Sequence, residues 1–191
     1  GLWGKEFFYT SQLAMTRAAG FSEMEIAKMT KIFDESWYYI STPHLPGHEY
    51  PKGIELLKKM WAFIDSESRR DFGFLDQNAP MFFDLYRQPQ LREFYSYDPY
   101  ETLSRIKCPV LAMNGDKDVQ VTSKENLAAI EKALHDGGNS NYKIIELPNH
   151  NHIFQECQTG KISEYKKIRS TFSEKSLTII SEWINNLSSP N

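Results

Sequence analysis

Two short apolar runs, separated by one helical segment, most strongly limit what this chain can fold into. Residues 108–115 are typical of a strand buried on both faces, and residues 142–147 predict the next strand. Between them, Thr122 begins a capping box that ends at Glu125, and Gly137 ends the helical pattern. A strand, a helix and a second strand in this order predict a right-handed unit with parallel strands.

Two parallel strands cannot hide both of their faces from water. Parallel sheets contain several strands and carry helices on both faces. A last amphipathic helix is expected to begin at a capping Ser173, with an apolar face formed by Leu177, Ile180, Trp183 and Ile184. The predicted fold class is therefore α/β, and we expect the chain to be part of a larger fold.

The first half of the chain has a different character, because all of its periodic segments are helical. One helix is expected over residues 5–19 and ends at Gly20, and a capping box at Ser22 begins a second helix. No strand is expected before residue 97. We therefore divide the chain into a helical segment, residues 1–96, and an α/β segment, residues 97–191.

Charge and composition exclude several classes of function. The 22 Lys and Arg residues and the 25 Asp and Glu residues give a net charge of −3, with neither sign gathered in one half. This balance argues against a nucleic-acid partner and against a membrane surface. No run approaches the roughly 18 to 20 apolar residues of a membrane span, and the start lacks the features of a signal peptide. A cytoplasmic protein is favoured, although a signal upstream of Gly1 stays open.

The two cysteines lie too far apart in the sequence to indicate a metal site or a disulfide framework. Cys108 and Cys157 have no C-x-x-C partner, and we expect both to be small buried side chains. No metal and no organic cofactor is predicted.

Acidic side chains and histidines follow the two predicted strands where each strand ends. Asp116 and Asp118 come after the first strand, and His150 and His152 come after the second. Because the carboxyl ends of neighbouring parallel strands lie side by side, an acid and an imidazole should meet there. Such a pair is the second and third member of a hydrolase triad. Asp116 is expected to be a turn residue, and the spacing alone leaves open which histidine meets the acid.

Residues 106–121 and 147–155, with matching positions up to the last helix, resemble the C-terminal part of α/β-hydrolases of the esterase or serine-aminopeptidase-like kind. The resemblance implies that Asp118 is the catalytic acid and His152 the catalytic base. It leaves His150 facing solvent or packed against the helical segment. The helical segment is similar to the lid inserted between the sixth and seventh core strands of that family. Asn149 departs from the glycine that the family usually has at this position of the loop.

The nucleophile motif G-x-S-x-G occurs nowhere in the chain. In the family that it resembles, the serine precedes the acid and the histidine, so we expect it upstream of Gly1. The chain is then a C-terminal fragment that should not catalyse alone. Uncovered strand edges and apolar patches on such a fragment also predict self-association.

The expected function of the full-length protein is hydrolysis of small-molecule carboxylic esters or of N-terminal peptide bonds. Four aromatic side chains are candidates for an acyl or aminoacyl pocket, although packing between helices would explain them too: Tyr38, Phe82, Phe83 and Tyr86. Two alternatives stay open at this point. One is a binding protein on a hydrolase scaffold, and the other is a metal-dependent hydrolase that uses His150 and His152.

Overall fold

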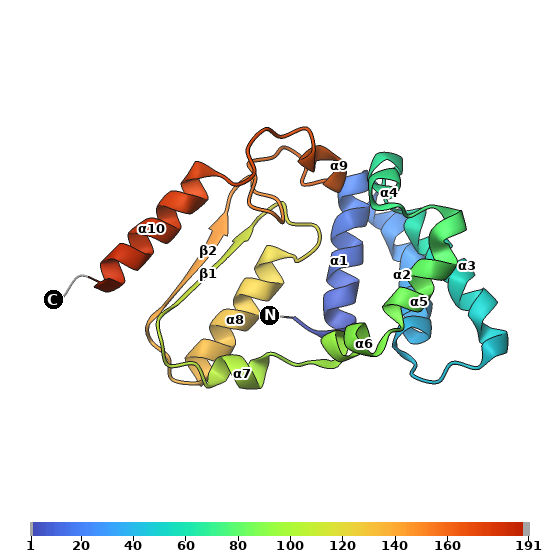
Figure 1. The fold of residues 1–191 in the computed structure, drawn as a ribbon, viewed down its shortest axis with the longest axis horizontal. Coiled ribbons are helices and arrows are strands. Elements are labelled where there is room, and N and C mark those ends of the chain that lie inside the picture. The colour runs from blue at the N-terminus through green and yellow to red at the C-terminus, as the bar shows by residue number, and fades with distance from the viewer. Residues whose placement is uncertain (1, 189–191) are drawn as a thin grey trace. The chain divides into compact units, whose positions relative to one another are not determined.

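The computed structural model describes residues 2–188 and divides the chain into two compact units (Figure 1). The helical unit contains Trp3–Asp98 and Lys161–Ser163. The α/β unit contains Leu2, Pro99–Gly160 and the described residues from Glu164 onward. The two units are described separately below.

The helical unit contains no strand within its described residues. Its elements are α1 (Gly4–Ala19), α2 (Glu23–Ser41), the 3₁₀ helix η1 (Gly47–Glu49), α3 (Tyr50–Trp61), α4 (Ser66–Phe72), the 3₁₀ helix η2 (Asp76–Asn78), α5 (Ala79–Tyr86) and α6 (Pro89–Ser96).

The two helix ends predicted most directly by the sequence are confirmed. The Ser22 hydroxyl accepts a hydrogen bond from the Glu25 backbone N–H, and the Glu25 carboxylate accepts one from the Ser22 backbone N–H at 2.8 Å. This is a complete capping box at the start of α2. Gly20 ends α1 with φ 98°, a left-handed conformation that glycine adopts without steric cost.

Aromatic side chains are the largest members of the core of the helical unit. Phe33, Trp61 and Phe83 are fully enclosed, and Trp61 stacks on Phe74 with ring centroids 5.0 Å apart. Burial of each such side chain contributes roughly 1.5–3 kcal/mol. Gly53 leaves room for this packing, because a Cβ at that position would lie 2.4 Å from the Phe83 ring.

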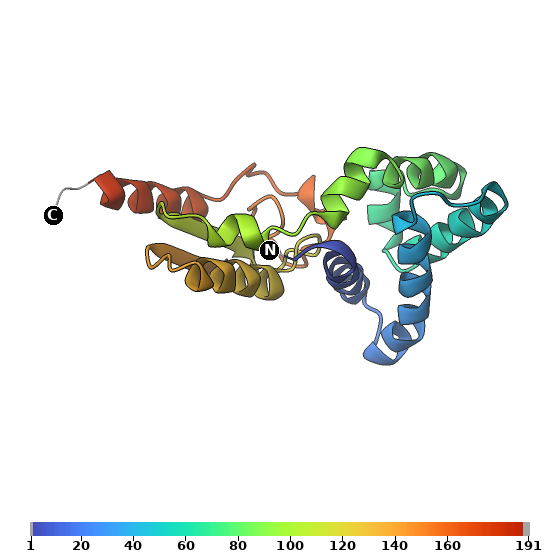
Figure 2. The ribbon, with the colours of Figure 1, turned by 90° about the horizontal axis from the view of Figure 1, so that it is seen from below.

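The α/β unit is built on two parallel strands, as the sequence predicts. Its elements are α7 (Tyr100–Ser104), β1 (Val110–Gly115), α8 (Ser123–Asp136), β2 (Tyr142–Leu147) and α10 (Glu174–Ser188), while the short helix α9 (Ile162–Tyr165) crosses the boundary between the units. The strands pair in register from Val110 opposite Tyr142 to Gly115 opposite Leu147. Helix α8 lies on one face of the sheet and α10 on the other (Figures 1 and 2).

Three expectations from the sequence are wrong in this unit. Strand β1 is half-buried over most of its length, because the sheet has only two strands within the described residues. The Thr122 hydroxyl does not cap α8 and is buried without a partner, while the next residue, Ser123, bonds to Glu146. Cys108 is exposed, whereas Cys157 is buried, which raises the pKa of its thiol to about 11.

None of the helices in residues 2–188 combines the length and the apolar character that a membrane crossing requires.

Candidate active site

Two loops that follow β1 and β2 are locked together by their backbones. The Lys117 N–H donates to the His150 carbonyl oxygen at 3.0 Å, and the Asn149 N–H donates to Asp116 Oδ1 at 2.6 Å. Asp116 is thus a turn residue that joins the loops. Gly115 permits this contact, because a Cβ there would lie only 2.0 Å from the His150 carbonyl oxygen.

Asp118 is held in one orientation by three hydrogen bonds. Its Oδ1 accepts from the backbone N–H groups of Gln120, at 2.9 Å, and Val121, at 2.8 Å. Its Oδ2 lies 2.9 Å from Nδ1 of His152. The residue is 5% exposed, so little solvent competes for these bonds. The carboxylate is therefore fixed before any substrate arrives.

His152 presents one ring nitrogen to Asp118 and keeps the other open. Nδ1 donates to the carboxylate, and Nε2 has no hydrogen-bond partner among the residues that the structure describes. The imidazole side chain is 36% exposed. The hydrogen bond to Asp118 raises the pKa of His152 above its ordinary value, and partial burial opposes that shift. An imidazole in this state can accept a proton at Nε2 and return it later.

Asn151 organises the loop that carries His152. Its fully buried side chain accepts hydrogen bonds at Oδ1 from the backbone N–H groups of Ile153 (3.1 Å) and Gln155 (3.0 Å). Its Nδ2 donates to Oε1 of Gln155 at 2.9 Å. Phe154 adopts a left-handed φ of 60° within this tight turn. Our sequence reasoning missed Asn151 and Gln155, although asparagine next to a candidate histidine is a turn signal.

Asn149 preserves the backbone conformation that glycine would supply. Its φ is 59°, in the left-handed region, where glycine has no steric penalty and asparagine is the most tolerated alternative. The departure from the glycine of similar hydrolases therefore leaves the local backbone able to form this turn.

His150 is not at the surface, and this expectation from the sequence is wrong. The residue is 1% exposed, with Nδ1 2.8 Å from the Pro148 carbonyl oxygen and Nε2 2.7 Å from Oγ of Ser173. Because a carbonyl oxygen only accepts, Nδ1 carries the proton and Nε2 accepts from the Ser173 hydroxyl. Both nitrogens of His150 are therefore engaged in the structure of the loop.

This geometry also removes the basis for a metal site on the two histidines. His150 and His152 direct their ring nitrogens to different partners, Ser173 and Asp118. Within residues 2–188, no three His, Cys, Asp or Glu side chains gather so that they could hold one ion. The metal-dependent alternative has no ligand set in this part of the chain.

Ser173 couples the histidine loop to the last helix. Its Oγ accepts from the Ser176 backbone N–H at 3.0 Å, which caps α10 as predicted, and its own N–H donates to the Phe154 carbonyl oxygen at 2.9 Å. The same hydroxyl donates to His150. One side chain thus joins the start of α10 to the turn that positions His152.

Tyr165 contacts both strand-end loops. Its hydroxyl accepts from Nε2 of Gln120 at 3.2 Å, on the acid loop, and interacts with the backbone of His152. Burial raises the pKa of the Tyr165 hydroxyl to about 12. Tyr165 therefore stays neutral near pH 7 and acts as a fixed bridge between the loops.

The four aromatic candidates for substrate contact occupy different positions in the helical unit. Phe83 is fully buried in the core, as the packing interpretation requires. Tyr38 is exposed, and Phe82 packs edge-to-face against Trp61. Tyr86 lies beside a small cavity of about 70 Å³, and burial raises the pKa of its hydroxyl. Contact of Tyr38, Phe82 or Tyr86 with a substrate stays a prediction.

Residues 75–177 match the model of the prolyl oligopeptidase family. The chain belongs to this family. Its members are α/β-hydrolases, so the resemblance predicted from the sequence is confirmed at that level. The matched part of this prolyl oligopeptidase family member contains both strands, Asp118 and His152. No curated protein and no solved structure matches the chain.

Replacement of Ser173 by alanine should destabilise the chain. The change removes the cap of α10 and leaves Nε2 of buried His150 without a donor, which together cost roughly 2–4 kcal/mol. Urea unfolding followed by circular dichroism measures this loss. Ser181→Ala, at an exposed position of the same helix, is the control and should change stability by less than about 0.5 kcal/mol. Equal urea midpoints for Ser173→Ala and Ser181→Ala would contradict the role of Ser173 as the cap of α10 and the partner of His150.

The pKa of His152 should lie above the 6.5 of an ordinary histidine, and Asp118→Asn should lower it. Because the folded-state pKa is raised, the pair stabilises the fold fully below about pH 6.5. This stabilisation is lost as the pH rises through the folded-state value. An NMR titration of the imidazole signals measures the shift. Asp116→Asn, which does not touch His152, is the matched control, and a His152 pKa unmoved by Asp118→Asn would refute the coupling.

Proposed function

We propose that the full-length protein is a serine hydrolase that cleaves carboxylic esters or N-terminal peptide bonds, with Asp118 and His152 as its acid and base. One observation carries this proposal. A buried carboxylate lies 2.9 Å from Nδ1 of an imidazole whose Nε2 is open. Membership of a hydrolase family supports the reaction class.

The proposed reaction follows from the positions of the two ring nitrogens of His152, since Nδ1 contacts Asp118 and Nε2 is open. A serine supplied from outside these 191 residues attacks the acyl carbonyl, and Nε2 of His152 takes the hydroxyl proton. The imidazolium then gives that proton to the leaving alkoxide or amine. Water then attacks the acyl-enzyme: Nε2 of His152 takes a proton from the water and gives it to the departing serine oxygen. Asp118 keeps the proton on Nδ1 and stabilises the positive charge at each step, and no metal or organic cofactor takes part.

The helical unit is proposed to serve as the lid of this hydrolase. Two observations support this role: the unit is all-helical over its described residues and rich in aromatic side chains, and it precedes a strand-containing unit in the sequence. Apolar and aromatic surfaces of this kind suit acyl groups. Tyr38, Phe82 and Tyr86 are the side chains proposed to reach such a group.

A fluorophosphonate probe on the full-length gene product tests the proposal. We expect labelling of the wild-type protein, and a loss of at least about 10³-fold in the labelling rate for His152→Ala. Asp118→Asn should slow labelling strongly as well. His135→Ala, at an exposed position on α8, is the control and should label normally. The 191-residue chain alone should not label.

Two outcomes would overturn the proposal. Absence of labelling in a folded full-length protein would favour a binding protein on a hydrolase scaffold. Labelling that survives His152→Ala would place the base elsewhere.

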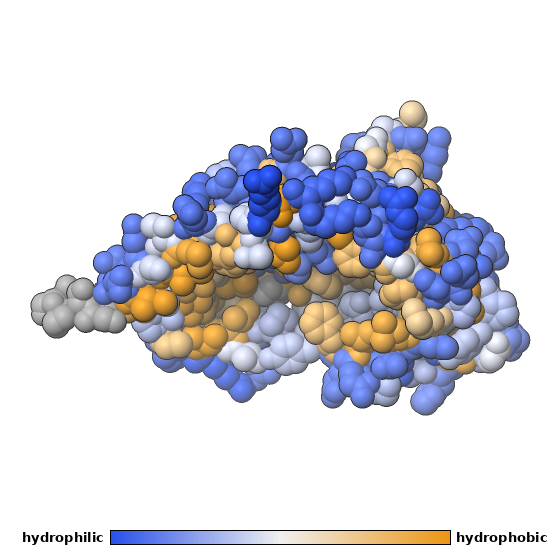
Figure 3. Space-filling model, turned by 45° about the horizontal axis from the view of Figure 1, so that its top comes forward, coloured by the Kyte–Doolittle hydropathy of each residue, from blue (hydrophilic) through white to orange (hydrophobic). Residues whose placement is uncertain are grey.

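A second proposal is that the 191-residue chain associates with itself. Apolar side chains of α10 are exposed, at Leu177, Ile184 and Leu187, and hydrophobic side chains gather beside the end of this helix (Figure 3). Exposed patches and free strand edges favour association.

Light scattering of the 191-residue chain should therefore show a mass that rises with concentration. The double variant Leu177→Glu and Ile184→Glu should shift the chain to the monomer, because it places charges on the patch. Met24→Glu, at an exposed position of α2, is the control and should leave association unchanged. A wild-type chain that is monomeric at all concentrations would contradict this second proposal.

A further inference from the structure

The helical unit contains a cavity that the proposed hydrolase does not use. It lies where the start of α1, the end of α2 and helix α6 meet, and its volume is about 590 Å³. This volume falls within the range of small-molecule sites, roughly 300–1,000 Å³. All of its lining residues belong to the helical unit, so the cavity is complete within that unit.

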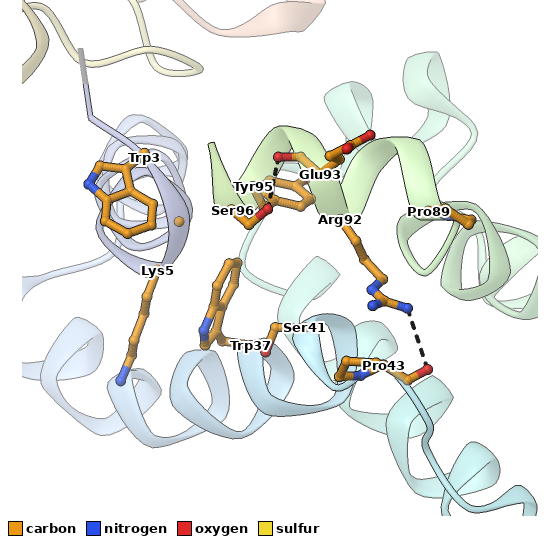
Figure 4. Close-up of a pocket in the computed structure, with 11 residues that line it drawn as sticks. Trp3, Lys5, Trp37, Ser41, Pro43, Pro89, Arg92, Glu93, Tyr95 and Ser96 are labelled. Carbon is orange, nitrogen blue, oxygen red and sulfur yellow. Dashed lines mark hydrogen bonds between the residues drawn. The ribbon is translucent and has the colours of Figure 1, made fainter. Parts of the chain in front are cut away.

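Aromatic rings form the walls of this cavity. Trp3, Trp37 and Tyr95 stand around the open space in Figure 4. The rings of Trp37 and Tyr95 meet edge-to-face with centroids 5.7 Å apart. Trp3 is substantially exposed, although burial of a tryptophan is strongly favourable. The walls therefore offer aromatic surface, and the Trp3 ring keeps part of its surface uncovered.

A guanidinium group with unused donors lies at one end of the cavity. Arg92 extends from α6 toward the Pro43 carbonyl oxygen, and Nη1 lies 3.5 Å from it (Figure 4). Because this contact is long and a guanidinium has five N–H donors, most of them stay available. No carboxylate within residues 2–188 pairs with Arg92. Glu93, the neighbouring acid, directs its carboxylate away from Arg92.

A second guanidinium group, which is not part of the lining, lies beside the end of the cavity. Nη2 of Arg87 lies 3.5 Å from the same Pro43 oxygen, and Nη1 of Arg87 donates to the Tyr39 carbonyl oxygen. Tyr39 lies in the last turn of α2 and Pro43 lies just beyond it, where the helix dipole carries about half of a negative charge. The two guanidinium groups exceed this partial charge, and Glu93, the acid of the lining, directs its carboxylate away from Arg92, so an anion is favoured at Arg92.

We infer that this cavity binds an organic carboxylate with an apolar, aromatic body. The ring of the ligand packs against Trp37 and Tyr95, and its carboxylate forms a two-point contact with the guanidinium of Arg92. Lys5 contributes less, because it already forms an ion pair with Asp34 at 2.6 Å. The site depends only on the helical unit, so it can exist whether or not the hydrolase proposal holds.

NMR of the ¹⁵N-tryptophan-labelled chain, titrated with 4-phenylbutyrate, tests the site. The indole signals of Trp3 and Trp37 should shift and saturate. Those of Trp61, which is buried in the core, and Trp183, on α10, should stay in place. The matched alcohol, 4-phenyl-1-butanol, should bind roughly tenfold more weakly, because it cannot pair with the guanidinium.

Substitutions at Arg92 separate a charge-specific site from an apolar surface. Arg92→Gln should lower the affinity for 4-phenylbutyrate by roughly tenfold and leave the affinity for the alcohol unchanged. Arg92→Lys should give an intermediate affinity, because it keeps the charge and loses the planar fork. Arg70→Gln, at an exposed position of α4 away from the cavity, is the control. Ser41→Phe, which adds a ring to the lining, should abolish binding of both compounds.

Three results would overturn the inference. They are the absence of saturable shifts at Trp3 and Trp37, equal affinity for the acid and the alcohol, and an affinity unaffected by Arg92→Gln. Circular dichroism of each variant checks that the helices are intact. Because none of these measurements requires hydrolysis, failure of this site and failure of the proposed function are distinguished.

Discussion

The close approach of the His150 backbone to Gly115 is the constraint on which the rest of the candidate active site depends. A side chain at position 115 would occupy the space of the His150 carbonyl group, so glycine there allows the two strand-end loops to interlock. Once the loops are joined by the hydrogen bond from Lys117 to His150, Asp118 and His152 come within 2.9 Å of each other. The polar pair is thus a consequence of backbone packing at the end of the sheet.

Buried polar side chains then fix the orientation of the catalytic candidates. Asn151 forms the turn that carries His152, Ser173 joins this turn to α10, and Tyr165 bridges to the acid loop. Each of these groups is satisfied by hydrogen bonds, and this matters because an unsatisfied buried polar group costs roughly 1–3 kcal/mol. The site is therefore held mainly by side chains other than Asp118 and His152.

Local spacing in the sequence predicts the parallel pair of strands, the capping box at Ser22, the cap at Ser173 and the meeting of an acid with an imidazole at the strand ends. The choice of Asp118 and His152 for that meeting comes from the resemblance to α/β-hydrolases, and the two side chains do meet. Local spacing fails where the outcome depends on contacts between distant segments. His150 looks like a surface residue beside a polar loop, but Ser173, 23 positions later, provides a buried partner. Cys108 and β1 are more exposed than their apolar neighbours suggest, because burial depends on how many strands and helices surround a segment. Thr122 follows the capping pattern, yet its hydroxyl forms no bond with the helix.

The central claim is that this chain supplies the acid and the base of a serine hydrolase. The most direct test is a crystal structure of the full-length protein after reaction with an organophosphonate. We expect phosphorus to be bonded to a serine oxygen within about 3 Å of Nε2 of His152, with Nδ1 still bonded to Asp118. A phosphonate on another residue type, or a modified serine remote from His152, would contradict it.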